Sequence, residues 1–407
     1  MRAASARAEA RARFRLRLLI VFLLALTIAY ARQFAVSSTA GQDFRVFYAA
    51  AQAAKEGASP YDWAALARAE DRLYNAPSHL QPRDPAYFYF LAFPEGPWLA
   101  AALEPLTALP WRAAFAVFDG LLLAAIAGGV LLCGRSLGWT TRRRRLAALC
   151  VVLSPIGFLN LFMGQVSVLV FFGLAGAWAL ARGGRPVLGG LLLTLSWIKP
   201  NIGLPLCLVV VLLQPAVARR ILAGFLGGTA VAFLYAFAWL GQGFFAWPLQ
   251  VPRMWQAVQG PQPDISSLES FFFPGLSGPG RTVALALALA LAAAYGWWAV
   301  SRTRGDKRGL SLLLLWLAAL PFVQSYDLVL LTPVVLTLLR PDGSGWRDHL
   351  LEATVWAFAL FPFFYFLGAR IGFFNGFTAI PVAMLVVAWH RGALNADRPA
   401  AVQGAAA

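Results

Sequence analysis

Long apolar runs separated by short polar stretches are the main pattern of this sequence. The clearest runs are Leu18–Ala31, Phe115–Leu132, Ile221–Leu240, Thr282–Val300 and Glu352–Leu367. About twenty such residues cross the hydrocarbon core of a membrane as a helix, which forms all its backbone hydrogen bonds internally where water is absent. The pattern therefore predicts an all-α integral membrane protein with several spans.

The composition supports this prediction and excludes a soluble globular domain. Apolar residues make up 60% of the 407 positions and charged residues 13%. Soluble domains are about 45–50% apolar and about 25% charged. The three cysteines, Cys133, Cys150 and Cys207, all lie within apolar runs. We interpret them as small buried hydrophobic residues, not as a disulfide set or a metal site.

The net charge of +16 raises the question of nucleic-acid binding, and the position of the charges decides against it. Short basic clusters occur between apolar runs, at Arg2 to Arg17, Arg142–Arg145, Arg182 with Arg185, Arg219–Arg220 and Arg302 to Arg308. They recur at every second loop, as expected if basic loops stay in the cytoplasm. No basic face is interleaved with stacking aromatic residues, as single-strand binders require.

The alternation of basic loops predicts a cytoplasmic N-terminus and about 10–12 transmembrane helices in a multi-pass chain. The lower bound reflects the short apolar segments 186–198, 202–213 and 310–323. The first apolar run is interpreted as an uncleaved signal anchor, with a cleavable signal peptide as the alternative. Residues from 32 onward lie outside in both cases.

The expected organisation is a single membrane domain over residues 18–392. It follows a basic cytoplasmic segment, 1–17, and precedes a tail expected to be disordered, 393–407. Two long outer loops are predicted, at about 32–112 and 241–281. The first is expected to contain a helix over Phe44–Glu56 and to break at Pro94–Pro97 before the next span.

Several polar residues fall at the outward ends of the predicted spans, and polar groups near a bilayer are costly unless they have a function. They are Asp43, Glu95, Gln165, Lys199, Glu269 and Asp327. Because they share one face, we expect the chemistry of the protein to lie there.

Two interpretations remain open for each of these residues. Asp43 is either the N-cap of the helix that follows it or a general base that deprotonates an acceptor hydroxyl. Lys199 is either a lysine that extends to the membrane surface or a point charge that binds phosphate.

Ser325-Tyr326-Asp327 forms either a turn with a helix cap or a second acidic or hydroxyl contact for a ligand. Gly164-Gln165 forms a tight outward turn that either binds a sugar through its glutamine or only connects two apolar runs. Glu269 either binds a ligand or satisfies a loop amide. Gly224 and Gly228 form a small-xxx-small pair, which is typical of helix packing.

The sequence lacks the common signatures of nucleotide and metal sites. There is no GxxxxGK[ST], no GxGxxG ahead of a helix and no D-x-D. His79, His349 and His390 are far apart in the sequence. We therefore predict no metal site and no cofactor.

The outward motifs, taken in order, resemble those of glycosyltransferase family 87 (GT87, the DUF2029 type), which belongs to the GT-C class. The resemblance covers roughly residues 40–340 and rests on Asp43-Phe44, Phe47-Tyr48-Ala49-Ala50, Gly57, Pro60-Tyr61-Asp62, Gly164-Gln165, Arg182 to Pro186, Gly189-Gly190, Lys199-Pro200, Ser266-Ser267-Leu268 and Tyr326-Asp327-Leu328. The chain departs from the family at Phe93–Pro97, where members commonly carry Tyr-Pro-Pro. It also reads Gln324-Ser325 where many members carry a histidine.

The resemblance implies a membrane glycosyltransferase with a GT-C-like helical bundle and a long extracytoplasmic first loop. It implies inverting transfer of a sugar, with mannose favoured, from a polyprenyl-phosphate donor to a lipid or glycan acceptor on the outer face of the bacterial plasma membrane. Asp43 would be the base, and Lys199 or Arg45 would meet the phosphate. Substrate contacts are expected from Gln165, Tyr326, Asp327, Glu95 and Glu269.

A non-catalytic lipid or polysaccharide carrier, or an assembly protein, is the alternative from another class. A carrier would place polar residues along a path through the membrane and show repeat symmetry between its halves. The polar residues of this chain gather outside instead, which favours the enzyme.

Overall fold

The structure is a computed structural model. It describes residues 40–74, 93–241, 244–245, 247–248, 278–319, 323–338, 382–383 and 385–390, together with residues 21, 25, 28 and 32. Outside the described residues lie all of segment 1–17, most of Leu18–Ala31, loop positions 249–277 with Glu269, the run Glu352–Leu367, the tail 393–407, and His79 and His349.

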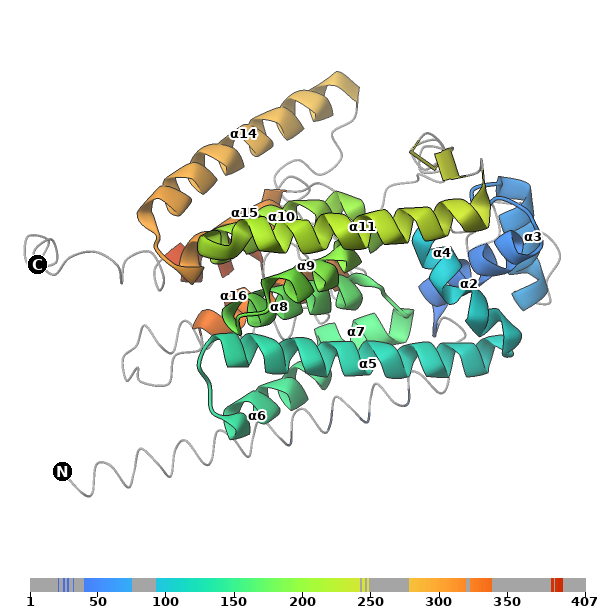
Figure 1. The fold of residues 1–407 in the computed structure, drawn as a ribbon, viewed down its shortest axis with the longest axis horizontal. Coiled ribbons are helices and arrows are strands. Elements are labelled where there is room, and N and C mark those ends of the chain that lie inside the picture. The colour runs from blue at the N-terminus through green and yellow to red at the C-terminus, as the bar shows by residue number, and fades with distance from the viewer. Residues whose placement is uncertain are drawn as a thin grey trace, which may run out of the picture.

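Every element within the described ranges is helical, which confirms the predicted all-α class (Figure 1). In chain order the elements are α2 (Gln42–Lys55), α3 (Trp63–Tyr74), α4 (Pro97–Leu103), η1 (Glu104–Ala108), α5 (Trp111–Ser136), α6 (Thr141–Val152), α7 (Pro155–Met163), α8 (Ser167–Arg182), α9 (Pro186–Leu193), η2 (Thr194–Ile198), α10 (Pro200–Leu213), η3 (Pro215–Val217), α11 (Ala218–Leu240), α14 (Gly278–Arg302), α15 (Asp306–Ala319), η4 (Ser325–Leu331) and α16 (Thr332–Leu338).

Two helices of the described part are long and apolar enough to cross a membrane, Trp111–Ser136 and Pro215–Leu240. They contain two of the predicted spans, Phe115–Leu132 and Ile221–Leu240. A bent pair formed by α6 and α7 raises the number to three if it is one broken span. Shorter apolar helices accompany them, at Ser167–Arg182, Pro186–Ile198, Pro200–Leu213 and Tyr326–Leu338. The total of 10–12 spans stays a prediction.

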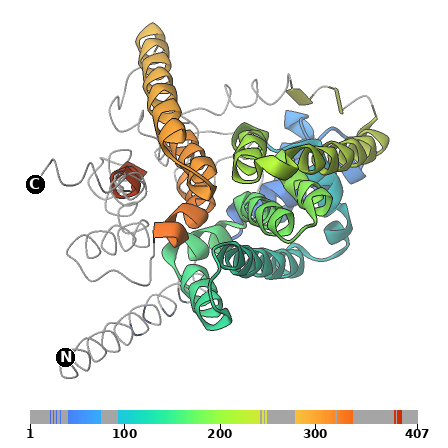
Figure 2. The ribbon, with the colours of Figure 1, turned by 60° about the vertical axis from the view of Figure 1, so that its left-hand side comes forward.

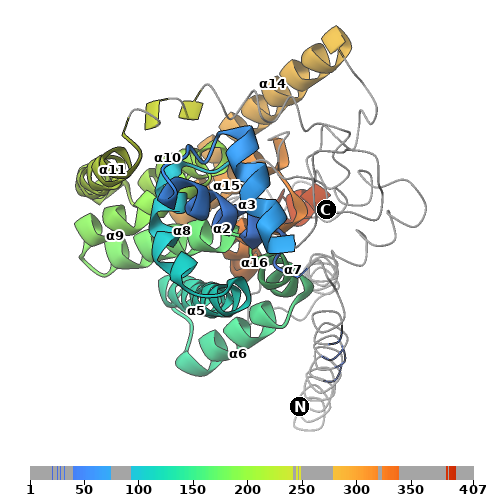
Figure 3. The ribbon, with the colours of Figure 1, turned by 90° about the vertical axis from the view of Figure 1, so that its right-hand side faces the viewer.

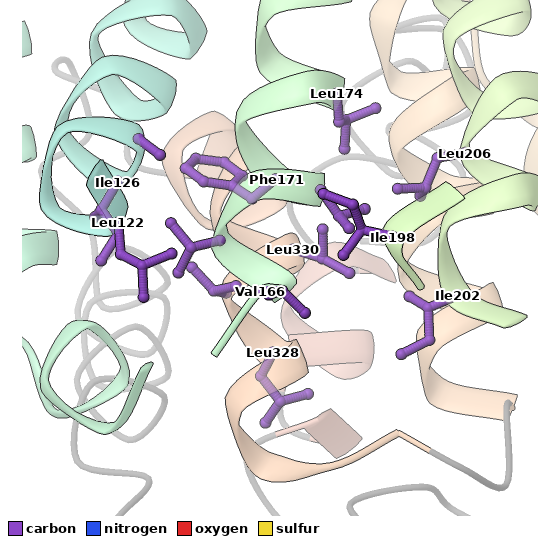
Figure 4. Packing of buried hydrophobic residues seen from close by; sticks show 14 of the residues in the cluster. Leu122, Ile126, Val166, Phe171, Leu174, Ile198, Ile202, Leu206, Leu328 and Leu330 are labelled. Carbon is purple, nitrogen blue, oxygen red and sulfur yellow. The ribbon is translucent and has the colours of Figure 1, made fainter. Parts of the chain in front are cut away.

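Helix α8 lies at the centre of the bundle because most of its residues are apolar or small and buried. It packs against α5, α9, α10, η2 and η4. Figure 4 shows this core from close by: Phe171 and Leu174 of α8 lie between Leu122 of α5 and Leu206 of α10. Helix α14 runs along the outside, against α15 (Figure 2).

Glycines let helix α9 approach α11 closely. A Cβ atom on Gly224 would lie 2.1 Å from the Val187 carbonyl oxygen, and one on Gly190 would lie 2.0 Å from that of Ile221. A Cβ atom on Gly228 would likewise lie close to a neighbour, 2.3 Å from the side-chain oxygen of Thr194 in η2. The packing interpretation of Gly224 and Gly228 is therefore confirmed. Helix α9 packs against both α8 and α11.

The segment that contains α2, α3 and α4, predicted to be the first outer loop, folds over one end of the bundle (Figure 3). Helix α2 packs against α5 and α7, and α4 packs against α11. Helix α4 begins at Pro97, with Gly96 as its N-cap, directly after the predicted break in the chain. The other end of the bundle carries arginines, and there the Arg182 guanidinium donates a hydrogen bond to the Ser136 carbonyl oxygen at 2.6 Å. Helices α5 and α8 therefore run from the loop-covered end to the arginine-rich end.

Helix α2 begins earlier than predicted, and this corrects one interpretation of Asp43. The helix spans Gln42–Lys55 instead of Phe44–Glu56, and its N-cap is Gly41, with φ of 71°. The Gly41 N–H donates to the Phe162 carbonyl oxygen at 2.7 Å, which ties the helix start to α7. Asp43 therefore lies inside the first turn, and the N-cap interpretation of Asp43 is wrong.

Candidate active site

Lys199 forms a buried ion pair with Asp327. The Lys199 Nζ lies 2.9 Å from Asp327 Oδ1, and the two side chains are 10% and 1% exposed. The ammonium also lies 4.4 Å from the centre of the Tyr326 ring. Lys199 separates η2 from α10 with φ of −124° and ψ of 81°, outside the α-helical region that a following proline disfavours. The interpretation of Lys199 as a lysine extending to the membrane surface is wrong, because its charge points into the protein.

Asp327 caps a helix and binds two side chains at the same time. Its Oδ2 accepts a hydrogen bond from the Gln324 backbone N–H at 3.0 Å, as part of a capping box at the start of η4. Its Oδ1 accepts from the Ser167 hydroxyl as well as from Lys199. The cap interpretation is therefore confirmed, and the carboxylate is also available to position the ammonium.

A glycine turn brings Gln165 to Asp43. Gly164 ends α7 in the left-handed conformation, with φ of 73°, and confirms the predicted turn. A Cβ atom on Gly164 would lie 2.6 Å from the Phe44 Cβ, so only glycine lets the turn approach α2 this closely. The Gln165 side-chain N–H then donates a hydrogen bond to Asp43 Oδ2. Asp43 is half-buried, whereas Gln165 is buried.

These two sets of contacts meet at the start of α8. Gln165 and Ser167 flank Val166, so the Asp43–Gln165 bond and the Ser167–Asp327–Lys199 bonds leave from one short segment. We call Asp43, Gln165, Ser167, Lys199 and Asp327 the polar cluster. Its members come from α2, the α7–α8 turn, α8, the η2–α10 junction and η4.

Glu95 lies beside the polar cluster and is 3% exposed. Burial raises the pKa of its carboxyl to about 8; the nearby charge of Lys199 lowers the pKa, and those of Asp43 and Asp327 raise it. Its backbone carbonyl accepts a hydrogen bond from the Tyr61 hydroxyl at 2.7 Å. Burial likewise raises the pKa of Tyr61 well above its ordinary value.

Two predicted site residues remain: Arg45 contacts an aromatic ring, and Glu269 is not described. The Arg45 guanidinium lies over the Trp111 ring, 4.4 Å from its centre. Glu269 lies outside the described residues. Of the predicted contacts, the structure thus brings together Asp43, Glu95, Gln165, Lys199, Tyr326 and Asp327.

Sequence reasoning missed Ser167 and Asn160, both of which are fully buried. The Asn160 side-chain N–H donates to the Tyr326 carbonyl oxygen at 3.0 Å and to that of Ile156 at 2.9 Å, which holds η4 against α7. Asn160 is the polar residue of an otherwise apolar helix, Pro155–Met163, and this isolation was the available signal.

No group of three or more metal-binding side chains occurs within the part of the chain that the structure describes. The cysteines Cys133, Cys150 and Cys207 are free thiols. The polar cluster offers the carboxylate of Asp43 and the ammonium of Lys199, and most of its side chains are buried away from water. Such a pair suits proton removal at one atom and charge neutralisation at another.

The comparison with protein families agrees with this chemistry. A family model described as glycosyltransferase family 87 matches residues 93–333. This range covers more than half of the chain. The chain belongs to glycosyltransferase family 87.

This family 87 protein is accordingly a membrane glycosyltransferase, and the predicted family is confirmed. The matched range contains Glu95, Gln165, Lys199 and Asp327, whereas Asp43 precedes it. Searches among curated proteins and among solved structures found no match.

Proposed function

We propose that this glycosyltransferase transfers a sugar, with mannose favoured, from a polyprenyl-phosphate donor to a lipid or glycan acceptor, with inversion at the anomeric carbon. One observation carries the proposal: the Asp43 carboxylate and the Lys199 ammonium belong to one polar cluster at one end of an apolar bundle, Asp43 through Gln165 and Lys199 through Asp327. A lipid-linked donor has its phosphate at the membrane interface and its hydrocarbon chain in the lipid, which suits such a site.

Asp43 is the proposed general base. Its Oδ2 is bound by Gln165, which orients the carboxylate without neutralising it. The half-buried Asp43 accepts the proton of the acceptor hydroxyl while the hydroxyl oxygen forms a bond to the anomeric carbon. The bond from that carbon to the phosphate oxygen breaks on the opposite side, so the configuration inverts.

Lys199 is the proposed partner of the leaving phosphate. Its ammonium has three N–H groups, of which one points to Asp327. The remaining groups are available to neutralise the charge that develops on the phosphate oxygen, which is the role of a cation in such a step. Asp327 and Ser167 act as positioning residues because they hold Lys199 and the start of α8 together.

The proposed orientation places the polar cluster at the extracytoplasmic face of the bacterial plasma membrane. Arg182 lies at the far ends of α5 and α8 from the cluster, in contact with Ser136 and Asp306. Basic residues stay on the cytoplasmic side of membrane proteins, which supports this orientation.

Asp43→Asn tests the role of the base. Because Gly41 is the N-cap of α2, asparagine at position 43 removes no cap. We expect sugar transfer to fall by about a hundredfold or more, since a base contributes about 10²–10⁴-fold. The assay is transfer from a polyprenyl-phosphate sugar to an acceptor lipid by purified protein in detergent or vesicles.

Asp62→Asn is the matched control. Asp62 is an exposed carboxylate of the same outer loop, and its Oδ1 caps α3 by accepting from the Ala64 and Ala65 N–H groups at 2.9 and 3.1 Å. Asparagine caps about as well as aspartate, so transfer should stay near the wild-type rate. Near-normal transfer by Asp43→Asn would refute its role as the base.

A further inference from the structure

Glu95 is held rigidly where the first outer loop returns to the bundle. It follows Pro94 and precedes Gly96, and a Cβ atom at Gly96 would lie 1.9 Å from the Trp98 ring. The Tyr61 hydroxyl fixes the backbone of Glu95 from the other side, at 2.7 Å. Because the backbone is fixed on both sides, the carboxyl has a defined position.

One oxygen of this carboxyl has nothing to bind. Oε2 is buried and has no hydrogen-bond partner among the residues that the structure describes. The backbone N–H of Glu95 itself favours the ionised form and lowers the pKa, but by less than burial raises it. An ionised carboxylate with an unpaired buried oxygen is strongly disfavoured, so the group is expected to keep a proton.

The charges around Glu95 act in opposite directions: Lys199 lowers the pKa, Asp43 and Asp327 raise it, and burial outweighs each of them. Asp43 on α2 and Asp327 on η4 carry negative charge, and Tyr61 ahead of α3 adds no positive charge. Lys199 is the cation that acts on Glu95, and it is already bound to Asp327. Burial is the largest influence and raises the pKa to about 8. Near neutral pH the side chain is therefore the uncharged acid.

An uncharged acid is a hydrogen-bond donor, and this donor needs an acceptor. A phosphate supplies oxygens that accept strongly from O–H groups, with a short charge-assisted bond. The carboxylate form would instead repel a phosphate, in a site where water does not screen the repulsion.

We propose that Glu95 binds the donor lipid as an uncharged acid, donating its Oε2 proton to a phosphate oxygen beside Lys199. This inference rests on the proposed function, since it assumes a phosphate-linked donor. Glu95 then complements Lys199: one supplies charge and the other a hydrogen bond, and the phosphate meets no added negative charge.

The test is the pH dependence of donor binding. The probe is a sugar-free isoprenyl methyl phosphodiester, whose charge is constant over the pH range used. For wild-type protein we expect the dissociation constant to rise about tenfold between about pH 7 and about pH 9, because the binding-competent acid is depleted. Glu95→Gln keeps an N–H donor but has no proton to lose. Its dissociation constant should therefore not show this tenfold rise between about pH 7 and about pH 9.

Two variants accompany that measurement. Glu95→Ala removes the donor, so its dissociation constant should lie about tenfold above that of the wild type near pH 7 and should show no such rise by about pH 9. Glu104→Gln is the control: its carboxylate is partly exposed and lies 3.9 Å from Lys55, away from the polar cluster, so its pH profile should match that of wild type.

A direct measurement on the wild-type protein does not depend on the folding of any variant. Infrared difference spectra should show a protonated carboxyl band that is lost between about pH 7 and about pH 9 and that shifts when the phosphodiester binds. Absence of this band would overturn the proposal.

The binding results separate two failures. Two results would overturn the role of Glu95 alone. One is the same pH dependence of binding in the wild type and in Glu95→Gln. The other is that Glu95→Gln binds as weakly as Glu95→Ala near neutral pH. Failure of the wild-type protein to bind the phosphodiester at any pH would overturn the proposed donor class, and this role with it.

Discussion

Two ion pairs at opposite ends of the bundle have similar geometry and different surroundings. Lys199 and Asp327 lie 2.9 Å apart with side chains 10% and 1% exposed. Arg182 and Asp306 lie 2.6 Å apart with side chains 43% and 27% exposed. The distances alone would suggest equal importance, but the burial shows that the two pairs differ in energy and in role.

The difference follows from the cost of removing charge from water. An exposed pair is screened and contributes about 0–1 kcal/mol. A buried pair costs several kcal/mol per ion to desolvate, so it persists only where other contacts support it. Ser167 and the Gln324 backbone provide such contacts for Asp327. The arginine-rich end thus carries a pair that water screens, and the polar cluster keeps a charge where water is scarce.

Removing one member of the buried pair should have the largest effect on stability. We expect Asp327→Ala to lower the free energy of unfolding by about 3–5 kcal/mol, because Lys199 is left with an uncompensated buried charge. Detergent-based unfolding of the purified protein measures this. Replacing both residues, as Lys199→Met with Asp327→Leu, should recover most of the stability while sugar transfer stays lost. A loss below about 1 kcal/mol for Asp327→Ala would mean that the buried pair contributes no more to stability than an exposed one.

Two glycines, one at each end of the bundle, should also differ in their contribution to stability, but by a smaller amount. Gly164, at the polar cluster, and Gly184, near the basic end, have φ of 73° and 78°. Alanine at either position costs about 1–2 kcal/mol for the left-handed conformation. At Gly164 the new Cβ also meets Phe44 at 2.6 Å, whereas nothing lies within 4 Å at Gly184.

Gly164→Ala should therefore be the more destabilising of the two by about 1–3 kcal/mol, the usual cost of overpacking. It should also weaken sugar transfer, because the turn positions Gln165 against Asp43. Thermal unfolding of both variants in one detergent makes the measurement. Equal losses would mean that α2 moves away without cost.

The smallest effect is expected at the exposed pair. Asp306→Asn removes the charge that faces Arg182 and should change the free energy of unfolding by less than about 1 kcal/mol, with the difference shrinking as salt is added. Unfolding at low and high ionic strength measures both. A salt-independent loss of several kcal/mol would show that this pair is structurally as important as the buried one.

Several features of the site were predictable from sequence because their causes are local. The Gly164 turn, the break before Pro97 and the cap at Asp327 each depend on a few neighbouring residues. The gathering of Glu95, Gln165, Lys199 and Asp327 at one end followed from counting apolar spans. The start of α2 was not predictable, because packing selects Gly41: its Cβ position lies 3.0 Å from the Trp111 ring.

The sequence by itself determined that the chain is helical and that α5 and α11 are long apolar helices, because helix formation in apolar surroundings depends on composition over about twenty residues. The order of these apolar segments also determined which polar residues share an end of the bundle. Only the tertiary structure decided the partners. Gln165 meets Asp43 across 122 positions, Lys199 meets Asp327 across 128, and Ser167 meets Asp327 across 160. No local pattern encodes such pairings, because they arise where separate helices pack and a buried polar group must find a partner within reach.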